Sequence, residues 1–136
     1  MAAENQKPIG SGFGAKTPAA DVVAGMDLSG KNVIVTGGYS GIGIETVRAL
    51  AGVGAKITVP ARRPDTAASE LGKVVGDIEI ATMDLADLAS VKKFADDYVA
   101  TGRKLDILIN NAGIMACPLD RVGPGWERQF GVNHLG

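Results

Sequence analysis

The sequence predicts an α/β fold built around a doubly wound, parallel β-sheet. Short runs rich in Val and Ile alternate with longer stretches whose apolar residues recur at helical spacing. A glycine-rich turn follows the first of these predicted strands. Strands that alternate with helices of about 10 to 15 residues form β-α-β units. The right-handed crossovers of such units place helices on both faces of a parallel sheet.

Four strands and the helices between them follow from this alternation. The strands are predicted at 32–36, 56–59, 78–83 and 105–109, with Pro60 closing the second. Helices are predicted at 42–51, 64–73 and 88–98. A short helix is also predicted at 21–26, and a further one near 125–136, after a loop at 115–123. We expect the sheet order third, second, first, fourth. The fourth strand is then an edge, with backbone groups of Ile107 and Ile109 unpaired.

The amino-acid composition and net charge limit the kinds of partner that the protein is expected to bind. The chain has 136 residues, 46% of them hydrophobic, and a formal net charge of -1. This balance gives no indication of nucleic acid or an anionic membrane as a partner. No stretch has the length of a membrane span or the pattern of a signal peptide, so a cytoplasmic protein is expected. The single cysteine, Cys117, fits a loop thiol better than a nucleophile, and no cluster of metal ligands is present.

The most informative segment lies between the first strand and the following helix, where a phosphate-binding turn belongs. It reads Thr36-Gly37-Gly38-Tyr39-Ser40-Gly41-Ile42-Gly43. Gly37 would permit the tight turn, Gly41 would let a pyrophosphate approach the backbone, and Gly43 would let the helix pack close to the sheet. The helix N-terminus would add free N–H groups and a partial positive charge. A strand-to-helix turn without a ligand is the alternative.

A second segment, Asn110-Asn111-Ala112-Gly113, directly follows the fourth strand. Small and amide-bearing residues at the carboxyl end of a strand line the crevice of an open α/β sheet, although a plain polar turn is the alternative. The two segments together predict a partial Rossmann-type doubly wound parallel sheet. Such sheets have about six or more strands, so four strands indicate that the C-terminal half is missing.

The positions of the predicted strands divide the chain into two regions. Residues 29–136 are expected to be the N-terminal part of a dinucleotide-binding domain, and residues 1–28 an N-terminal extension. The glycines within 10–14 resemble a phosphate loop, but no predicted strand precedes them, so a flexible arm is favoured.

The two motifs resemble those of the short-chain dehydrogenase/reductase family. The segments 105–115 and 130–136 are similar to its retinol-dehydrogenase-like branch, which includes protochlorophyllide-reductase-like enzymes. The likeness extends over 28–136 and implies a set of cofactor-binding positions and one catalytic position. Those for the pyrophosphate and its ribose are Gly37, Gly38, Tyr39, Ser40, Gly41, Ile42 and Gly43. The positions implied for the adenine are Asp84 and Leu85. The positions implied for the ribose near the nicotinamide are Asn111, Ala112 and Gly113. The catalytic position implied is Asn133, beside a proton-relay water.

Some of these residues have other interpretations. Asp84 could cap the next helix, with or without contacting an adenine. His134, the only histidine, is interpreted as a structural or surface residue rather than a base.

The residues that transfer the proton in this family do not occur in the chain. The family uses a serine and a Tyr-x-x-x-Lys pair, whose spacing places both side chains on one helix face. Tyr39 and Tyr98 are instead followed four residues later by Gly43 and Gly102. We therefore expect a fragment that is inactive in isolation. The complete protein would be an oxidoreductase that transfers hydride between a nicotinamide and a small carbonyl or alcohol substrate, and it could form a homo-oligomer. A non-catalytic nucleotide-binding or redox-sensing module is the alternative.

Two arginines after the second strand favour NADP over NAD. Dinucleotide folds place a residue there beside the adenosine ribose, an Asp or Glu for NAD and an Arg for the 2′-phosphate of NADP. The segment contains Arg62 and Arg63, and no carboxylate precedes Asp65. We expect Arg62 to be the main phosphate contact and Arg63 a secondary one, through charge-assisted hydrogen bonds. Solvated surface arginines are the alternative.

Overall fold

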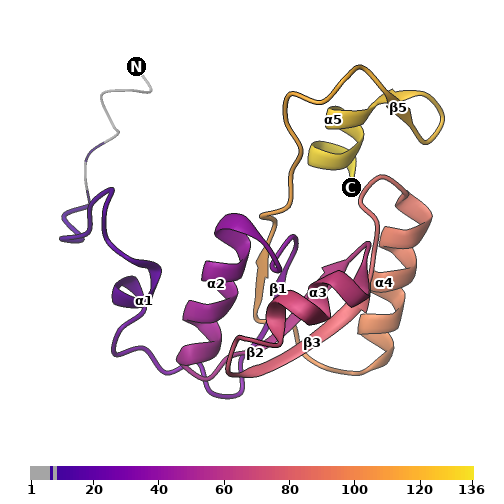
Figure 1. Cartoon of the computed structure of the whole chain (residues 1–136). Helices are drawn as coiled ribbons and strands as arrows, with labels where there is room; N and C mark the ends of the chain where they lie inside the picture. Colours follow the sequence, from indigo (N-terminus) through magenta and orange to yellow (C-terminus); the bar gives the residue numbers. More distant parts are fainter. Residues whose placement is uncertain (1–6, 8) are drawn as a thin grey trace.

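The structure, a computed structural model, describes residue 7 and residues 9–136. Through the first four strands, strands and helices alternate along the chain as the sequence predicts (Figure 1). The strands are β1 (Asn32–Val35), β2 (Lys56–Ala61), β3 (Asp77–Thr82), β4 (Ile107–Ile109), β5 (Arg121–Val122) and β6 (Trp126–Glu127). The helices are α1 (Ala19–Val22), α2 (Gly41–Gly52), α3 (Pro64–Leu71), α4 (Leu88–Ala100), α5 (Arg128–Phe130) and a π-helical turn, η2 (Gly131–Leu135).

The main sheet is parallel and has the order β3-β2-β1-β4, which confirms the predicted order and the edge position of β4. The register aligns Val33 with Ile57 on one side and with Ile107 on the other. All four strands therefore end at the same edge of the sheet, and the loops that follow them gather there.

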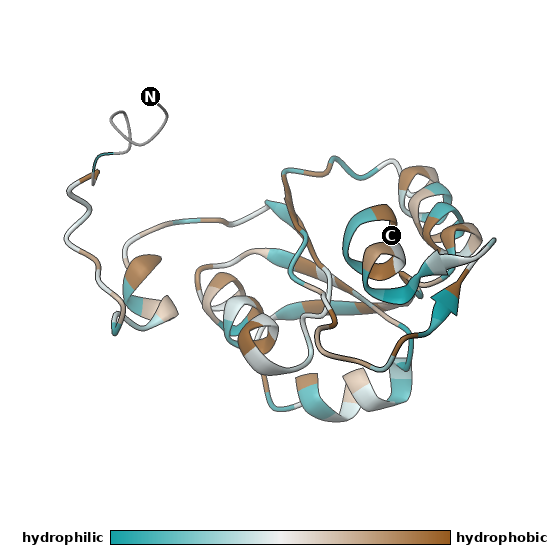
Figure 2. Ribbon diagram, turned by 90° about the horizontal axis from the view of Figure 1, so that it is seen from above, coloured by the Kyte–Doolittle hydropathy of each residue, from teal (hydrophilic) through white to brown (hydrophobic). Residues whose placement is uncertain are grey.

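The two faces of the sheet are covered by different helices. Alternate strand residues, such as Val35, Ile57 and Val59, form the core with Val47 of α2 and Leu71 of α3. Intervening residues point to the opposite face, which α4 covers. Apolar and polar residues alternate in colour around these helices (Figure 2), as expected for helices with one face on a sheet. The fold is thus doubly wound.

Most elements begin or end within two residues of the predicted positions, and larger differences occur at the first and last helices. β2 continues through Pro60 to Ala61, because beyond Thr58 it pairs only with β3 and a proline is tolerated where one side of a strand is free. The first short helix begins at Ala19 and ends at Val22, ahead of a left-handed Gly25 with φ of 81°.

The predicted C-terminal helix is the largest difference. It begins only at Arg128, because the residues before it form the hairpin β5-β6. Gly123 and Gly125, with φ of 56° and 117°, make the turn of this hairpin, and a Cβ at Gly123 would lie 2.9 Å from the ring of Trp126. Among the helices of the described residues, none combines the length and apolar composition needed to cross a bilayer.

Candidate functional site

A cleft of about 800 Å³ opens at the carboxyl ends of the strands. The C-terminal segment that contains α5 lies over this end of the sheet (Figure 1). The cleft brings together nearly all of the residues that the sequence singled out. These are Gly37, Tyr39, Ser40, Gly41, Ile42, Gly43, Arg62, Arg63, Asp84, Leu85, Asn111, Ala112 and Gly113.

The glycine turn has the three properties that its spacing predicts. Gly37 is left-handed, with φ of 64°, and a Cβ there would lie 3.0 Å from the Cα of Ala112. Gly41 is also left-handed, with φ of 53°, and nothing lies within 4 Å of its Cβ position. A Cβ on Gly43 would collide with the Gly37 carbonyl oxygen and would lie 2.6 Å from Asn111 Nδ2. The turn is therefore tight, open towards the cleft and closely packed behind it.

Asn111 connects the glycine turn to the end of β4. Its Nδ2 donates to the carbonyl oxygen of Thr36 at 2.9 Å and to that of Gly37 at 3.4 Å. In return, the Thr36 hydroxyl oxygen accepts a hydrogen bond from the N–H of Ala112 at 3.0 Å. Each strand end therefore satisfies polar groups of the other, which fixes the two cleft-lining loops relative to each other.

The N-terminus of α2 points its free N–H groups at the cleft. The first hydrogen bond of the helix runs from the N–H of Ile44 to the carbonyl of Ser40, at 3.3 Å. The Ser40 side chain makes no capping bond. The N–H groups of the first turn are thus without a helical acceptor, and with the helix dipole they form a suitable site for an anion.

Two exposed arginines, Arg62 and Arg63, lie where β2 gives way to α3 and line one part of the cleft. Within the part of the chain that the structure describes, no ion pair involves either guanidinium. Both cationic groups are therefore available to an anionic ligand.

Asp84 lies in the loop after β3 and does not cap α4. Its Oδ1 accepts from the N–H of Ala86 at 2.9 Å, and its own N–H donates to the Ser90 hydroxyl at 3.0 Å. The cap of α4 is Asp87, whose carboxylate accepts from the N–H of Ala89. The alternative interpretation of Asp84 as a helix cap is therefore wrong, and these bonds hold the loop that lines the cleft.

Two of the predicted positions do not line the cleft. Gly38 is buried, and a Cβ there would lie 2.8 Å from Val47 Cγ2, so it serves the packing of α2 on the sheet. Asn133, in η2, uses both ends of its amide on the backbone of Ile114: Oδ1 accepts from the N–H at 2.8 Å, and Nδ2 donates to the carbonyl at 2.7 Å. Asn133 thus holds the segment that follows Gly113.

The short helix that precedes Asn133 is well anchored. Glu127 caps α5 by accepting hydrogen bonds from the N–H groups of Gln129 and Phe130, each at 2.9 Å. These two bonds lower the pKa of the Glu127 carboxyl below its usual value. His134 stacks on Phe130 with ring centroids 5.0 Å apart and, like Cys117, does not line the cleft.

Some cleft residues were not predicted from the sequence. Thr66 and Glu70 lie four residues apart in α3, so the helical spacing could have placed both on one face, next to the arginines that precede the helix. Arg128 also lines the cleft, and its Nη1 lies 2.7 Å from Asp120 Oδ2. No local pattern marks Arg128, because its position depends on the hairpin and on the tie between Asn133 and Ile114.

Comparison with known sequences identifies a family for most of the chain. The family model for short chain dehydrogenases matches residues 31–136. A protein of Streptomyces antibioticus described as a probable oxidoreductase is 49% identical over 117 residues, which cover 82% of this chain and 38% of that protein. Mouse retinol dehydrogenase 12 is 41% identical over 116 residues, covering 82% of this chain and 37% of the enzyme. The chain therefore spans less than half the length of these relatives.

Solved structures share the fold. An uncharacterized protein from Mycobacterium paratuberculosis superposes with a TM-score of 0.74 at 38% identity, over 80% of this chain and 39% of that one. The NADP complex of RhlG from Pseudomonas aeruginosa superposes with a TM-score of 0.68 at 28% identity, over 88% of this chain and 46% of that one.

Proposed function

Since this chain belongs to the short-chain dehydrogenase/reductase family, we propose that it forms the NADP(H)-binding portion of an oxidoreductase. The family consists of oxidoreductases that use a nicotinamide cofactor, which accepts or delivers a hydride when bound. The proposed reaction interconverts a small-molecule carbonyl and the corresponding alcohol. The observation that carries the proposal is the cleft in which the glycine turn, the α2 N-terminus and Asn111–Gly113 meet two exposed arginines.

The cleft fits the proposed cofactor in size and in chemistry. Its volume of about 800 Å³ is that of a small-molecule site. We assign the pyrophosphate to the N–H groups at the start of α2, where Gly41 leaves the backbone open. We assign the adenine to the loop of Asp84 and Leu85, and the ribose beside the nicotinamide to the segment from Asn111 to Gly113.

The preference for NADP over NAD is assigned to Arg62, with Arg63 in support. A guanidinium binds phosphate oxygens through paired, charge-assisted hydrogen bonds, and neither arginine has an ion-pair partner among the described residues that it would have to leave. Glu70 lies in the same cleft, one helical turn beyond Thr66, and its carboxylate is a candidate to accept a hydrogen bond from a ribose hydroxyl. The relative bound to NADP supports the same preference.

Cofactor titration of the full-length protein tests this assignment. Arg62→Ala is expected to weaken NADP binding about 10- to 150-fold and to leave NAD binding nearly unchanged, since a hydrogen bond to a charged group is worth about 1.5–3 kcal/mol. Arg48→Ala, on the exposed side of α2 and outside the cleft, is the matched control and should change neither constant. A wild type that binds both cofactors equally, or an unchanged ratio in Arg62→Ala, would contradict the proposal.

Asn133 is assigned a positioning role in the same protein, through its two hydrogen bonds to Ile114. These bonds hold the segment on the nicotinamide side of the proposed cofactor. The family resemblance implies a role for this residue beside a proton-relay water, and the proposed positioning role is consistent with it.

A further inference from the structure

A second cavity, of about 450 Å³, lies on the face of the sheet that α4 covers. It shares no lining residue with the cleft. Its floor is formed by Thr58 of β2 and by Glu79 and Ala81 of β3, and α4 supplies Phe94 and Tyr98. The alternation of the strands explains this placement, since the neighbouring residues Ile57, Val59 and Ile80 face the core under α2 and α3.

Tyr98 gives this cavity an unsatisfied polar group. The residue is only 7% exposed, and its hydroxyl has no hydrogen-bond partner among the described residues. A buried hydroxyl without a partner is costly, so native structures normally provide one. Thr58, which is 4% exposed, also lines the cavity, as do Thr82, Ser90 and Thr101, while Phe94 and Ala81 supply its apolar part.

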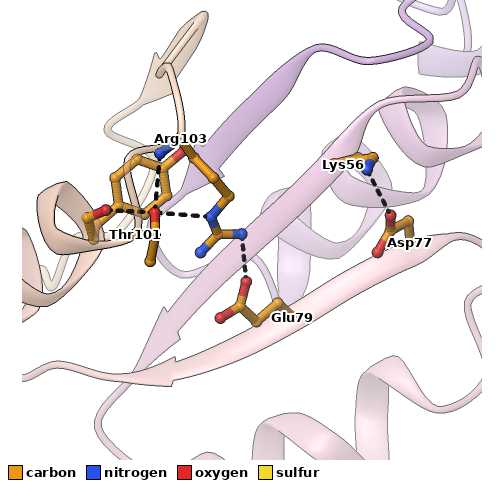
Figure 3. Close-up of polar contacts among 6 residues, drawn as sticks. Lys56, Asp77, Glu79, Thr101 and Arg103 are labelled. Atoms are coloured by element: carbon orange, nitrogen blue, oxygen red, sulfur yellow. Dashed lines mark hydrogen bonds and ion pairs between the residues drawn. The ribbon is translucent and has the colours of Figure 1, made fainter.

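The charges around the cavity are already paired. Arg103 Nη1 lies 2.7 Å from Glu79 Oε2, and the guanidinium also bonds Thr101 through Nε at 3.1 Å (Figure 3). The same guanidinium stands 4.9 Å from the centroid of the Tyr98 ring. Lys93 is paired with Asp97 at 2.6 Å. Both ion pairs include a side chain that is more than half exposed, so they form a rim rather than a charged interior.

We propose that this cavity binds a small neutral molecule with an apolar body and one hydroxyl or carbonyl oxygen. The oxygen pairs with the Tyr98 hydroxyl, and the body packs against Phe94 and Ala81. A charged ligand is disfavoured because the rim has no unpaired charge to receive it. The site is independent of the cofactor cleft, so it stands whether or not NADP binds there.

Benzyl alcohol is a suitable probe, with toluene and benzoate for comparison. We expect benzyl alcohol to shift the backbone NMR signals of Thr58, Ala81 and Thr101 of the full-length protein in a saturable way. Toluene lacks the oxygen and should bind about 3- to 10-fold more weakly, the range for one hydrogen bond. Benzoate, which is charged, should leave these signals unchanged. Shifts confined to the signals of Gly37 and Asn111 would place the probe in the other cleft and overturn the proposal.

Two variants make the test specific. Tyr98→Phe should remove the preference for benzyl alcohol over toluene. It should not lower the melting temperature, because it deletes a hydroxyl that has no hydrogen-bond partner within the described part of the chain. Ala81→Leu should fill the cavity and abolish binding of both probes. A far-UV circular dichroism spectrum that matches the wild type shows that each variant is folded. If benzyl alcohol produces no shift, as when an ordered water alone satisfies Tyr98, or if Tyr98→Phe behaves like the wild type, the proposal is wrong.

Discussion

Single residues in the glycine turn have distinct physical roles although they share one residue type. Gly41 is required for its backbone conformation, because its φ is 53° and its surroundings are open. Gly43 is required for its lack of a side chain, because the Gly37 carbonyl and Asn111 Nδ2 occupy the space where a Cβ would lie. Gly52, at the end of α2, has neither constraint, since it has no positive φ and nothing lies within 4 Å of its Cβ position.

This contrast leads to a prediction at the residue scale. Gly43→Ala should lower the free energy of unfolding by about 1–3 kcal/mol, because the added methyl group meets backbone that cannot move freely. Gly52→Ala, the matched control in the same helix, should raise it by about 0.4–1 kcal/mol by restricting the unfolded chain. Urea unfolding of both variants measures these changes. Equal effects of the two substitutions would show that the close contact at Gly43 is not a constraint.

At the scale of elements, a single carboxylate connects the start of β1 to the approach to β4. Asp106 Oδ2 accepts from the N–H of Asn32 at 3.1 Å, and Oδ1 lies 2.8 Å from Lys104 Nζ and 3.5 Å from Lys31 Nζ. The bond to Lys104, followed by the backbone bond from Asn32, lowers the pKa of Asp106 from 3.8 to about 2. Protonation must therefore weaken the contact between the two strands.

The direction of the resulting pH dependence follows from this shift. A carboxyl whose pKa is depressed by folding contributes stability that is complete above pH 3.8 and is lost as the pH falls towards 2. The unfolding free energy of Asp106→Asn should thus lie below that of the wild type at pH 6 and approach it at pH 2. Asp96→Asn is the control, since Asp96 only pairs with Lys92 on the exposed side of α4. Parallel curves for wild type and Asp106→Asn between pH 6 and pH 2 would refute the assignment.

At the scale of the whole molecule, the β4 edge of the sheet leads to a prediction about self-association. β4 is an edge strand in the described sheet, and its central residue, Leu108, is 53% exposed. An exposed apolar edge is a template for pairing with another chain. The polypeptide of residues 1–136 should therefore self-associate as its concentration rises.

Leu108→Lys should shift this equilibrium towards the monomer, because a charge on an edge strand discourages pairing. Leu119→Lys is the control, since Leu119 is 80% exposed but belongs to the loop before β5. Sedimentation velocity over a range of concentrations measures both effects. A wild-type polypeptide that stays monomeric throughout, or an equal effect of the two lysines, would show that the edge of β4 does not drive association.

The sequence by itself determined the strand order, the helices that separate the strands, and the membership of the glycine turn and Asn111–Gly113 in one cleft. These features depend on local periodicity and on the topology of β-α-β units, which act over short stretches of chain. The tertiary structure alone decided where Arg128 lies, that Gly38 is a packing residue, and that Asn133 engages the backbone of Ile114. It also decided the hairpin β5-β6, where a helix was predicted, and the cavity beside Tyr98. Each of these depends on contacts between residues distant in sequence or on unusual glycine φ angles, neither of which residue spacing encodes.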